Sequence, residues 1–358
     1  MNYAYWLANV PGIGNAKKHR LSAQAGGAKA LYFLSERQIG MLDGADARAV
    51  CRIAESRAQE TQERYEKMCA RGISFLSTED AAYPKRLRNI PDPPFGLYVR
   101  GRLPREEQRT AAIVGARMCS EYGMATARKL GEQLAACGVS IVSGMARGVD
   151  AAGHTGALAS GGGTCAVLGC GVDVCYPAEN RQLYTDIIQN GCVLSEYHPG
   201  TQPLPAFFPQ RNRIIAGLSD VVVVVEAKEK SGSLITADLA LEQGRDIYAV
   251  PGRICEPLSA GCNNLIRQGA GIISSVEDFL KDLDLGGRGE WEQESFEKLL
   301  LEKEERLVYS CVDLRPKSME ELLRRTGLGV PELSQALAGL VQKKFVAETF
   351  KNCYIRRI

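Results

Sequence analysis

The 358-residue chain lacks the features that direct a protein into or across a membrane. It has no apolar run of about 18 residues, so we expect no transmembrane helix. Its first residues form neither a basic segment nor a long apolar one, so we expect no secretory signal. These absences predict a cytoplasmic protein with no membrane partner.

The chain also lacks an excess of charge. Its 44 basic and 42 acidic residues give a net charge of +2, which excludes a protein that is basic throughout. The charge is unevenly placed, however, because residues 277–305 carry −7 and residues 306–358 carry +5. A local basic surface is therefore compatible with the composition.

Metal and cofactor motifs are scarce. The chain has three histidines, and its 12 cysteines include no Cys-x-x-Cys pair, so we expect no metal site. There is no Gly-x-x-x-x-Gly-Lys-Ser/Thr stretch. The Gly169-x-Gly171 segment lacks the third glycine of a dinucleotide fingerprint and follows the third predicted strand, so no nucleotide cofactor is expected.

Catalytic groups are few as well. No Gly-x-Ser-x-Gly nucleophile motif occurs. Asp150 and His154 lie four residues apart on a predicted helix and could form an acid–base pair, although a structural contact is the commoner use of such a pair. We therefore expect a binding protein rather than an enzyme, with no catalytic residues.

The first 75 residues are predicted to form a small helical domain. The loop 10–14 contains Gly12 and Gly14 and precedes the basic run 17–20, as in half of a helix-hairpin-helix unit of a SAM-like domain. Such loops can offer backbone N–H groups to a DNA phosphate, but a plain turn between helices is the favoured interpretation, because the glycines alone explain it. A long amphipathic helix is predicted over 46–71.

Residues 76–276 are predicted to form an α/β domain with a Rossmann-like, doubly wound and mostly parallel sheet. Short apolar runs alternate with helical segments, and Val221–Val225 is a run of five valines, typical of a strand covered on both faces. The predicted strands are 111–115, 139–143, 164–169, 192–196, 220–226 and 246–250. The predicted helices lie near 122–137, 149–160, 179–190, 210–218 and 234–244.

The remaining residues divide into two segments. Residues 277–305 are interpreted as a solvated acidic linker. Residues 306–358 show two helices followed by a hairpin, with a capping box at Ser318 and Glu321, which is the pattern of a winged-helix-like domain. That domain could contact DNA, another protein or its own copy.

The segments that follow the predicted strands share one chemistry. Glycine makes up 37 of the 358 residues, and many glycines fall at these strand ends beside serine hydroxyls and arginines. Loops at the carboxyl ends of parallel strands meet at one edge of the sheet, so they predict a phosphate pocket. Phe207 and Phe208 precede a cationic segment, an arrangement suited to stacking on the bases of a single strand, although core packing is an equal alternative.

The assembled motifs resemble the DNA-processing protein A family (DprA, also called Smf). Ser-Gly-Met-Ala-Arg-Gly-Val-Asp at 143–150 and Phe-Pro-Gln-Arg-Asn-Arg at 208–213 are among the matching stretches. The others are 113–117, 166–173, 176–180, 194–197, 231–237 and 261–266. The resemblance covers about residues 83–275.

This resemblance implies a single-stranded DNA-binding protein that protects incoming strands during natural transformation, loads the RecA recombinase onto them, and works as a homodimer through its Rossmann-like domain. Together, the strand-end chemistry and the resemblance predict these DNA-binding residues: Gly115, Arg117, Ser143, Gly144, Arg147, Phe208, Gln210, Arg211, Asn212, Arg213, Ser231, Gly232 and Ser233. Ala116 and Thr155 depart from the family pattern, in which Ser and Arg are common, and should weaken binding somewhat.

Two alternatives remain open. The Rossmann-like domain is similar to that of nucleotide phosphoribohydrolases, but the corresponding segment 230–236 lacks their catalytic glutamate. The second alternative to single-stranded DNA binding is a structural adaptor that acts through residues 306–358.

Overall fold

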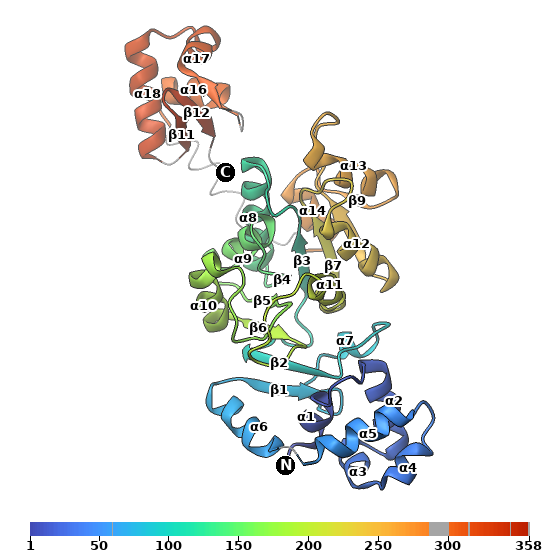
Figure 1. Ribbon diagram of the computed structural model, residues 1–358. Coiled ribbons are helices and arrows are strands. Elements are labelled where there is room, and N and C mark those ends of the chain that lie inside the picture. Colours follow the sequence, from blue (N-terminus) through green and yellow to red (C-terminus); the bar gives the residue numbers. More distant parts are fainter. Residues whose placement is uncertain (59, 286–300, 314–315, 344, 357–358) are drawn as a thin grey trace. The chain divides into compact units, whose positions relative to one another are not determined.

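A computed structural model describes residues 1–58, 60–285, 301–313, 316–343 and 345–356 (Figure 1). The chain divides into two compact units. One contains residues 1–119 and 127–279, and the other contains residues 120–126 and 280–358. Among the described helices, none combines the length and the apolar character needed to cross a membrane.

The N-terminal part of the first unit is helical, as predicted. Its described helices are α1 (Tyr3–Ala8), α2 (Asn15–Ala25), α3 (Ala28–Phe33), α4 (Glu36–Gly40), α5 (Ala47–Ser56) and α6 (Thr61–Ala70). Trp6, Leu21, Leu31 and Ile53 are fully buried among them and form a small core of their own. Short helices of this length depend on such packing for their stability.

The prediction of one helix over 46–71 is wrong, because the chain forms α5 and α6 instead. At the end of α5 the buried Ser56 hydroxyl accepts a hydrogen bond from Trp6 Nε1 at 2.9 Å. The next residue, Arg57, donates to the Leu34 carbonyl at 2.7 Å. These contacts with α1 and with the end of α3 fix where α5 stops.

The basic run 17–20 does not face solvent as a free cationic surface. Each of its four side chains contacts a protein group: in chain order, Asp46, the Ala8 carbonyl, the Pro93 carbonyl and Asp43. Gly12 has a φ of 73°, which glycine adopts without strain, and Gly14 caps α2. The loop therefore has the features of a turn between helices.

The centre of the first unit is a nine-stranded sheet with the order β1-β2-β6-β5-β4-β3-β7-β8-β9. Its strands are β1 (Ser74–Ser77), β2 (Gly96–Gly101), β3 (Thr110–Val114), β4 (Ser140–Ser143), β5 (Thr164–Val167), β6 (Cys192–Ser195), β7 (Val221–Val224), β8 (Asp246–Ala249) and β9 (Gly271–Ile272). All six predicted strands are present, and β1, β2 and β9 extend the sheet. The β1–β2 and β2–β6 pairs are antiparallel and the other neighbours are parallel, so the mostly parallel sheet is confirmed.

The order of the strands shows the double winding. From β3 the chain proceeds through β4, β5 and β6 to one side, and then returns to place β7, β8 and β9 on the other side. The direction of winding therefore reverses between β3 and β7, which are hydrogen-bonded neighbours. In open α/β sheets this switch point is where ligands bind.

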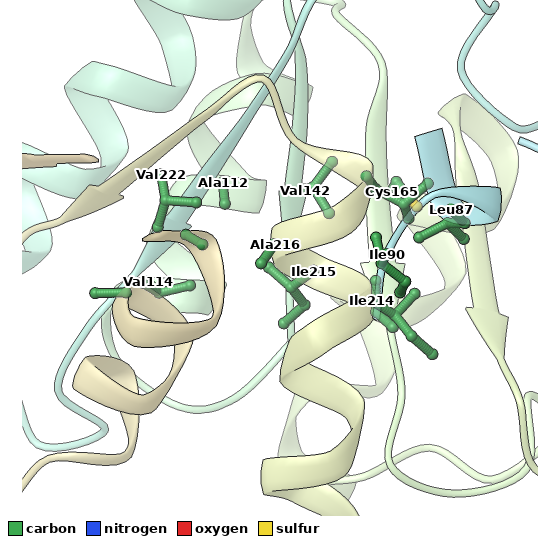
Figure 2. Packing of buried hydrophobic residues seen from close by; sticks show 14 of the residues in the cluster. Leu87, Ile90, Ala112, Val114, Val142, Cys165, Ile214, Ile215, Ala216 and Val222 are labelled. Atoms are coloured by element: carbon green, nitrogen blue, oxygen red, sulfur yellow. The ribbon is translucent and has the colours of Figure 1, made fainter. Parts of the chain in front are cut away.

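Helices between the strands build the main core. They are α7 (Lys85–Arg88), α8 (Glu121–Ala136), α9 (Val149–Ala159), α10 (Arg181–Asn190), α11 (Phe207–Leu218), α12 (Gly232–Glu242) and α13 (Ala260–Arg267). The core includes Val142 and Val222 of the sheet together with Ile214, Ile215 and Ala216 of α11 (Figure 2). All five side chains are at most 1% exposed. This packing fixes α11, which carries several of the predicted site residues.

The second unit contains three helices and a small antiparallel sheet within its described residues. These are α16 (Lys303–Cys311), α17 (Met319–Thr326), α18 (Val330–Gln342) and the strands β10 (Lys317–Ser318), β11 (Val346–Phe350) and β12 (Cys353–Arg356), in the sheet order β10-β12-β11. Leu333, Leu337 and Leu340 are buried on one face of α18, as expected. The two helices and the hairpin occur where predicted, while the winged-helix designation stays a prediction.

Two local expectations in this region need correction. Ser318 caps α17 by accepting the Glu321 N–H at 3.2 Å, but the Glu321 carboxylate contacts Lys317 at 2.9 Å, so no capping box is completed. Residues 277–282 are not solvated linker, because α14 (Val276–Asp282) is a helix whose Phe279 ring packs 4.8 Å from that of Tyr248. Residues 303–305 are not linker either, because they form the start of α16, while the part 286–300 lies outside the described residues.

Candidate nucleic-acid interface

A cavity of about 580 Å³ opens at the carboxyl ends of β3 and β7. Its lining comes mainly from residues 114–118 after β3, residues 205–215 at the start of α11, and residues 228–236 between β7 and α12. The cavity therefore lies at the switch point of the sheet, where the fold is expected to bind a ligand.

Eight of the 13 predicted site residues line this cavity, here called the switch-point cavity. They are Gly115, Arg117, Phe208, Arg211, Asn212, Ser231, Gly232 and Ser233. Segments that are more than a hundred residues apart in the chain are thus brought together, as the position of strand ends in a parallel sheet requires.

Arg117 provides an exposed positive charge next to the aromatic side of the cavity. Its guanidinium carbon lies 5.4 Å from the centre of the Phe208 ring, a cation–π contact. Phe208 in turn stacks on Tyr176, with ring centres 5.4 Å apart and planes inclined by 27°. Within the described chain no acidic side chain pairs with Arg117, so its charge is available to an anion.

Arg211 forms the floor of the cavity and is 5% exposed. Its guanidinium donates to the Gly144 carbonyl at 2.9 Å and to the Val167 carbonyl, at the ends of two strands. Burial lowers the pKa of Arg211 to about 10, and the nearby Asp150 carboxylate opposes that shift. Arg211 is therefore cationic at neutral pH.

Asp150 and His154 do not form an acid–base pair in this structure. Asp150 Oδ2 accepts the N–H groups of Gly144 and Ala146 at 3.1 and 3.4 Å, and burial raises its pKa. The fully buried His154 ring contacts the Thr164 hydroxyl through Nδ1 at 2.6 Å. Burial lowers the pKa of His154 to about 3, so the ring is neutral and contributes to packing.

The N-terminus of α12 forms another wall. Ser231 caps this helix, accepting the Ser233 N–H at 3.4 Å, and Asn212 Nδ2 donates to the Gly232 carbonyl at 3.3 Å. Free backbone N–H groups at a helix start favour anions, and Lys230 adds an exposed cation beside them.

Five predicted site residues lie outside the switch-point cavity. Ser143 is fully buried and donates to the Ile113 carbonyl at 2.6 Å. Gly144 lies behind the cavity, where its missing side chain makes room for Arg211. The exposed Arg147 pairs with Glu179 at 2.5 Å. The other two are Gln210 and Arg213.

Gln210 and Arg213 are directed elsewhere by α11. Gln210 is exposed and accepts the Tyr197 hydroxyl at 3.0 Å. Arg213 is buried and pairs with Glu196 at 2.6 Å and Asp92 at 3.1 Å. Residues two positions apart on a helix point in nearly opposite directions, so Arg211 and Arg213 cannot share one pocket.

Sequence reasoning missed several residues of the cavity. Lys228 and Lys230 line it from the segment after β7, and Tyr176 provides the ring under Phe208. The lysines could have been found from the sequence, because they lie in the segment that follows β7, at the same sheet edge as Arg117. Tyr176 begins the matching stretch 176–180, but nothing in the sequence placed it against Phe208, because that contact depends on the path of a loop.

With this geometry in place, comparison with known proteins identifies the family. The family model described as DNA recombination-mediator protein A matches residues 74–284, a range that contains every residue of the cavity. The chain belongs to this family. The resemblance inferred from the motifs is thereby confirmed.

Individual relatives support the same family assignment by their sequence identity to this chain. The DNA processing protein DprA of Streptococcus pneumoniae is 46% identical over 209 residues, covering 58% of this chain and 74% of the relative. Protein Smf of Synechocystis is 38% identical over 287 residues, covering 78% and 72%. The match to Smf thus extends beyond the family segment.

Solved structures of family members share the fold. The X-ray structure of DprA from Streptococcus pneumoniae has a TM-score of 0.69 and 36% identity, covering 79% of this chain and 98% of that one. A structure of DNA processing protein A from Helicobacter pylori has a TM-score of 0.53 and 34% identity, covering 59% and 95%. The latter work describes the single-stranded DNA binding mode of that protein.

Proposed function

We propose that the chain binds single-stranded DNA in the switch-point cavity. The observation that carries this proposal is the position of Arg117, which has no acidic partner among the described residues and lies over the Phe208–Tyr176 ring stack in the cavity lining. A cation beside stacked aromatic rings can hold a backbone phosphate and a base at once, without reading the base edge.

The remaining cavity residues support a phosphate ligand. The α12 N-terminus and Lys230 attract negative charge, and Arg211 holds a desolvated positive charge beneath the cavity. The single-stranded DNA binding mode described for the Helicobacter pylori relative supports the same ligand class.

We further propose that the protein binds its ligand without hydrolysing the bond between base and sugar. Asp150 is the carboxylate that lines the cavity, and it already accepts two backbone N–H groups. Incubating the protein with nucleoside monophosphates should release no free base. Detection of free base would instead favour a nucleotide hydrolase.

The family's description as recombination mediators supports a role downstream of binding. We propose that the protein protects incoming single strands and loads RecA onto them, as in natural transformation, and that it acts as a homodimer through the sheet-containing unit. RecA-dependent ATP hydrolysis on a preformed DNA complex should begin with a shorter lag than on DNA with RecA alone. An unchanged lag would argue against loading, and a monomer by analytical ultracentrifugation would argue against the dimer.

Binding itself is tested with a fluorescent oligo-dT and an Arg117→Ala variant. Loss of one charge-assisted contact should weaken binding by about 1–3 kcal/mol, or about 5-fold to 150-fold in Kd. Arg128→Ala is the matched control, because Arg128 is exposed on α8 and does not line the cavity. Equal affinities of the two variants would overturn the site assignment.

A further inference from the structure

A second cavity of about 470 Å³ lies beside the first, between α12 and α13. The two cavities share Lys230, Ser231, Gly232 and Ile235, so the start of α12 borders both. A strand whose phosphate reaches this helix start can therefore place neighbouring nucleotides on its two sides.

Two helix faces line the second cavity. Leu234 and Asp238 are one turn apart on α12, and Asn264, Leu265 and Gln268 follow one face of α13. No hydrogen bond or ion pair within the described part of the chain engages the side chains of Asp238, Asn264 or Gln268. The cavity thus offers leucine walls against which a ring can pack, together with free polar groups that can bind the edge of a base.

At Gly261, a lining residue of this cavity, α13 packs directly against the backbone of Ala227. The Gly261 N–H donates to the Ala227 carbonyl at 2.8 Å, which anchors the start of α13 to the segment that follows β7. A Cβ atom on Gly261 would lie only 2.8 Å from that same oxygen, so the close approach requires glycine. The start of α13 is therefore held close to the segment that follows β7.

The charges of this cavity differ from those of the switch-point cavity. Glu229 and Asp238 are exposed acidic residues of its lining, while Lys230 lies on the border shared with the first cavity. A phosphate would be repelled by the two carboxylates. The carboxylates can instead accept hydrogen bonds from amino groups on a base, such as the N4 amino group of cytosine.

We propose that the second cavity binds a base of the single strand held in the switch-point cavity and selects cytosine over thymine. This inference rests on the proposed function. Asp238 accepts a hydrogen bond from the cytosine N4 amino group. Thymine presents its O4 oxygen at the same position, and two acceptors facing each other leave both without a hydrogen bond.

The test compares oligo-dC with oligo-dT of about 20 nucleotides, long enough to exceed the usual site size, at one salt concentration. The wild-type protein should bind oligo-dC at least about fivefold more tightly, since a good base contact discriminates by about that factor or more. Asp238→Asn should abolish or invert this preference, because an amide can donate to thymine O4. Asp246→Asn removes the same charge at the start of β8, outside both cavities, and should leave the preference unchanged.

Equal wild-type affinity for the two oligonucleotides would overturn the inference, as would an Asp238→Asn protein with the wild-type preference. If Asp238→Asn bound oligo-dC and oligo-dT more tightly by the same factor, the substitution would only have relieved charge repulsion. That result would also count against a base site. Failure of the proposed function has a different signature: neither strand binds, or Arg117→Ala leaves both affinities unchanged.

Discussion

Gly144→Ala should displace Arg211 from the floor of the switch-point cavity without changing any residue that lines it. A Cβ atom at position 144 would lie 2.3 Å from Nη2 and 2.4 Å from Nη1 of Arg211, much closer than atoms can approach. Arg211 is 5% exposed and hydrogen-bonded to the carbonyls of Gly144 and Val167. Its guanidinium must therefore leave this position when a methyl group is added.

The size of the effect follows from the bonds that are lost. Each hydrogen bond from a charged donor contributes about 1.5–3 kcal/mol. Loss of the two bonds together gives an expected drop in unfolding free energy of about 3–6 kcal/mol. If the guanidinium turns into the cavity, it occupies the space for phosphate, and affinity for single-stranded DNA should fall at least about tenfold.

Urea unfolding and fluorescence anisotropy with oligo-dT measure the two effects. Gly163→Ala is the matched control, because a Cβ there has Ser140 Oγ at 3.6 Å as its nearest contact. That variant should stay within about 1 kcal/mol of wild type. A Gly144→Ala protein with wild-type stability and affinity would refute the role assigned to Arg211.

Three further predictions test other parts of the structure. The His154 pKa is about 3 when folded, against 6.5 in a free histidine, so the unfolded chain takes up the proton first. Unfolding free energy should therefore fall by up to about 1.4 kcal/mol per pH unit as the pH drops from 6.5 towards 3, and His154→Gln should remove this dependence. Glu179→Gln frees the exposed Arg147; higher DNA affinity by anisotropy would place Arg147 at the interface, and unchanged affinity would exclude it. Val222→Ala should reduce unfolding free energy in urea by about 2–3 kcal/mol, since Val222 is fully buried, and a loss below about 0.5 kcal/mol would contradict the tight packing of the main core around β7.

The strands were predictable because a buried strand leaves a local signal. Val221–Val225 is apolar without alternation, and the structure covers β7 on both faces. The end of α5 left no such signal. It depends on Ser56 meeting Trp6, which lies 50 residues earlier in the chain.

The candidate site was predictable at the level of loops rather than of side chains. Strand topology alone brings the segments after β3 and β7 together, and Arg117 and Ser231 accordingly line one cavity. Whether a side chain enters the cavity depends on helix phase and on competing partners. Arg213 lies outside the cavity for this reason, because Glu196 and Asp92 bind it on the other side of α11.

The most direct test of the central claim is the salt dependence of oligo-dT binding by wild-type and Arg117→Ala proteins. If Arg117 neutralises a backbone phosphate in the switch-point cavity, the slope of log K against log salt should become shallower by about 0.7 in the variant, the contribution of one phosphate on a single strand. Arg128→Ala should keep the wild-type slope. An Arg117→Ala protein whose slope equals that of wild type would contradict the proposal that this cavity binds single-stranded DNA through Arg117.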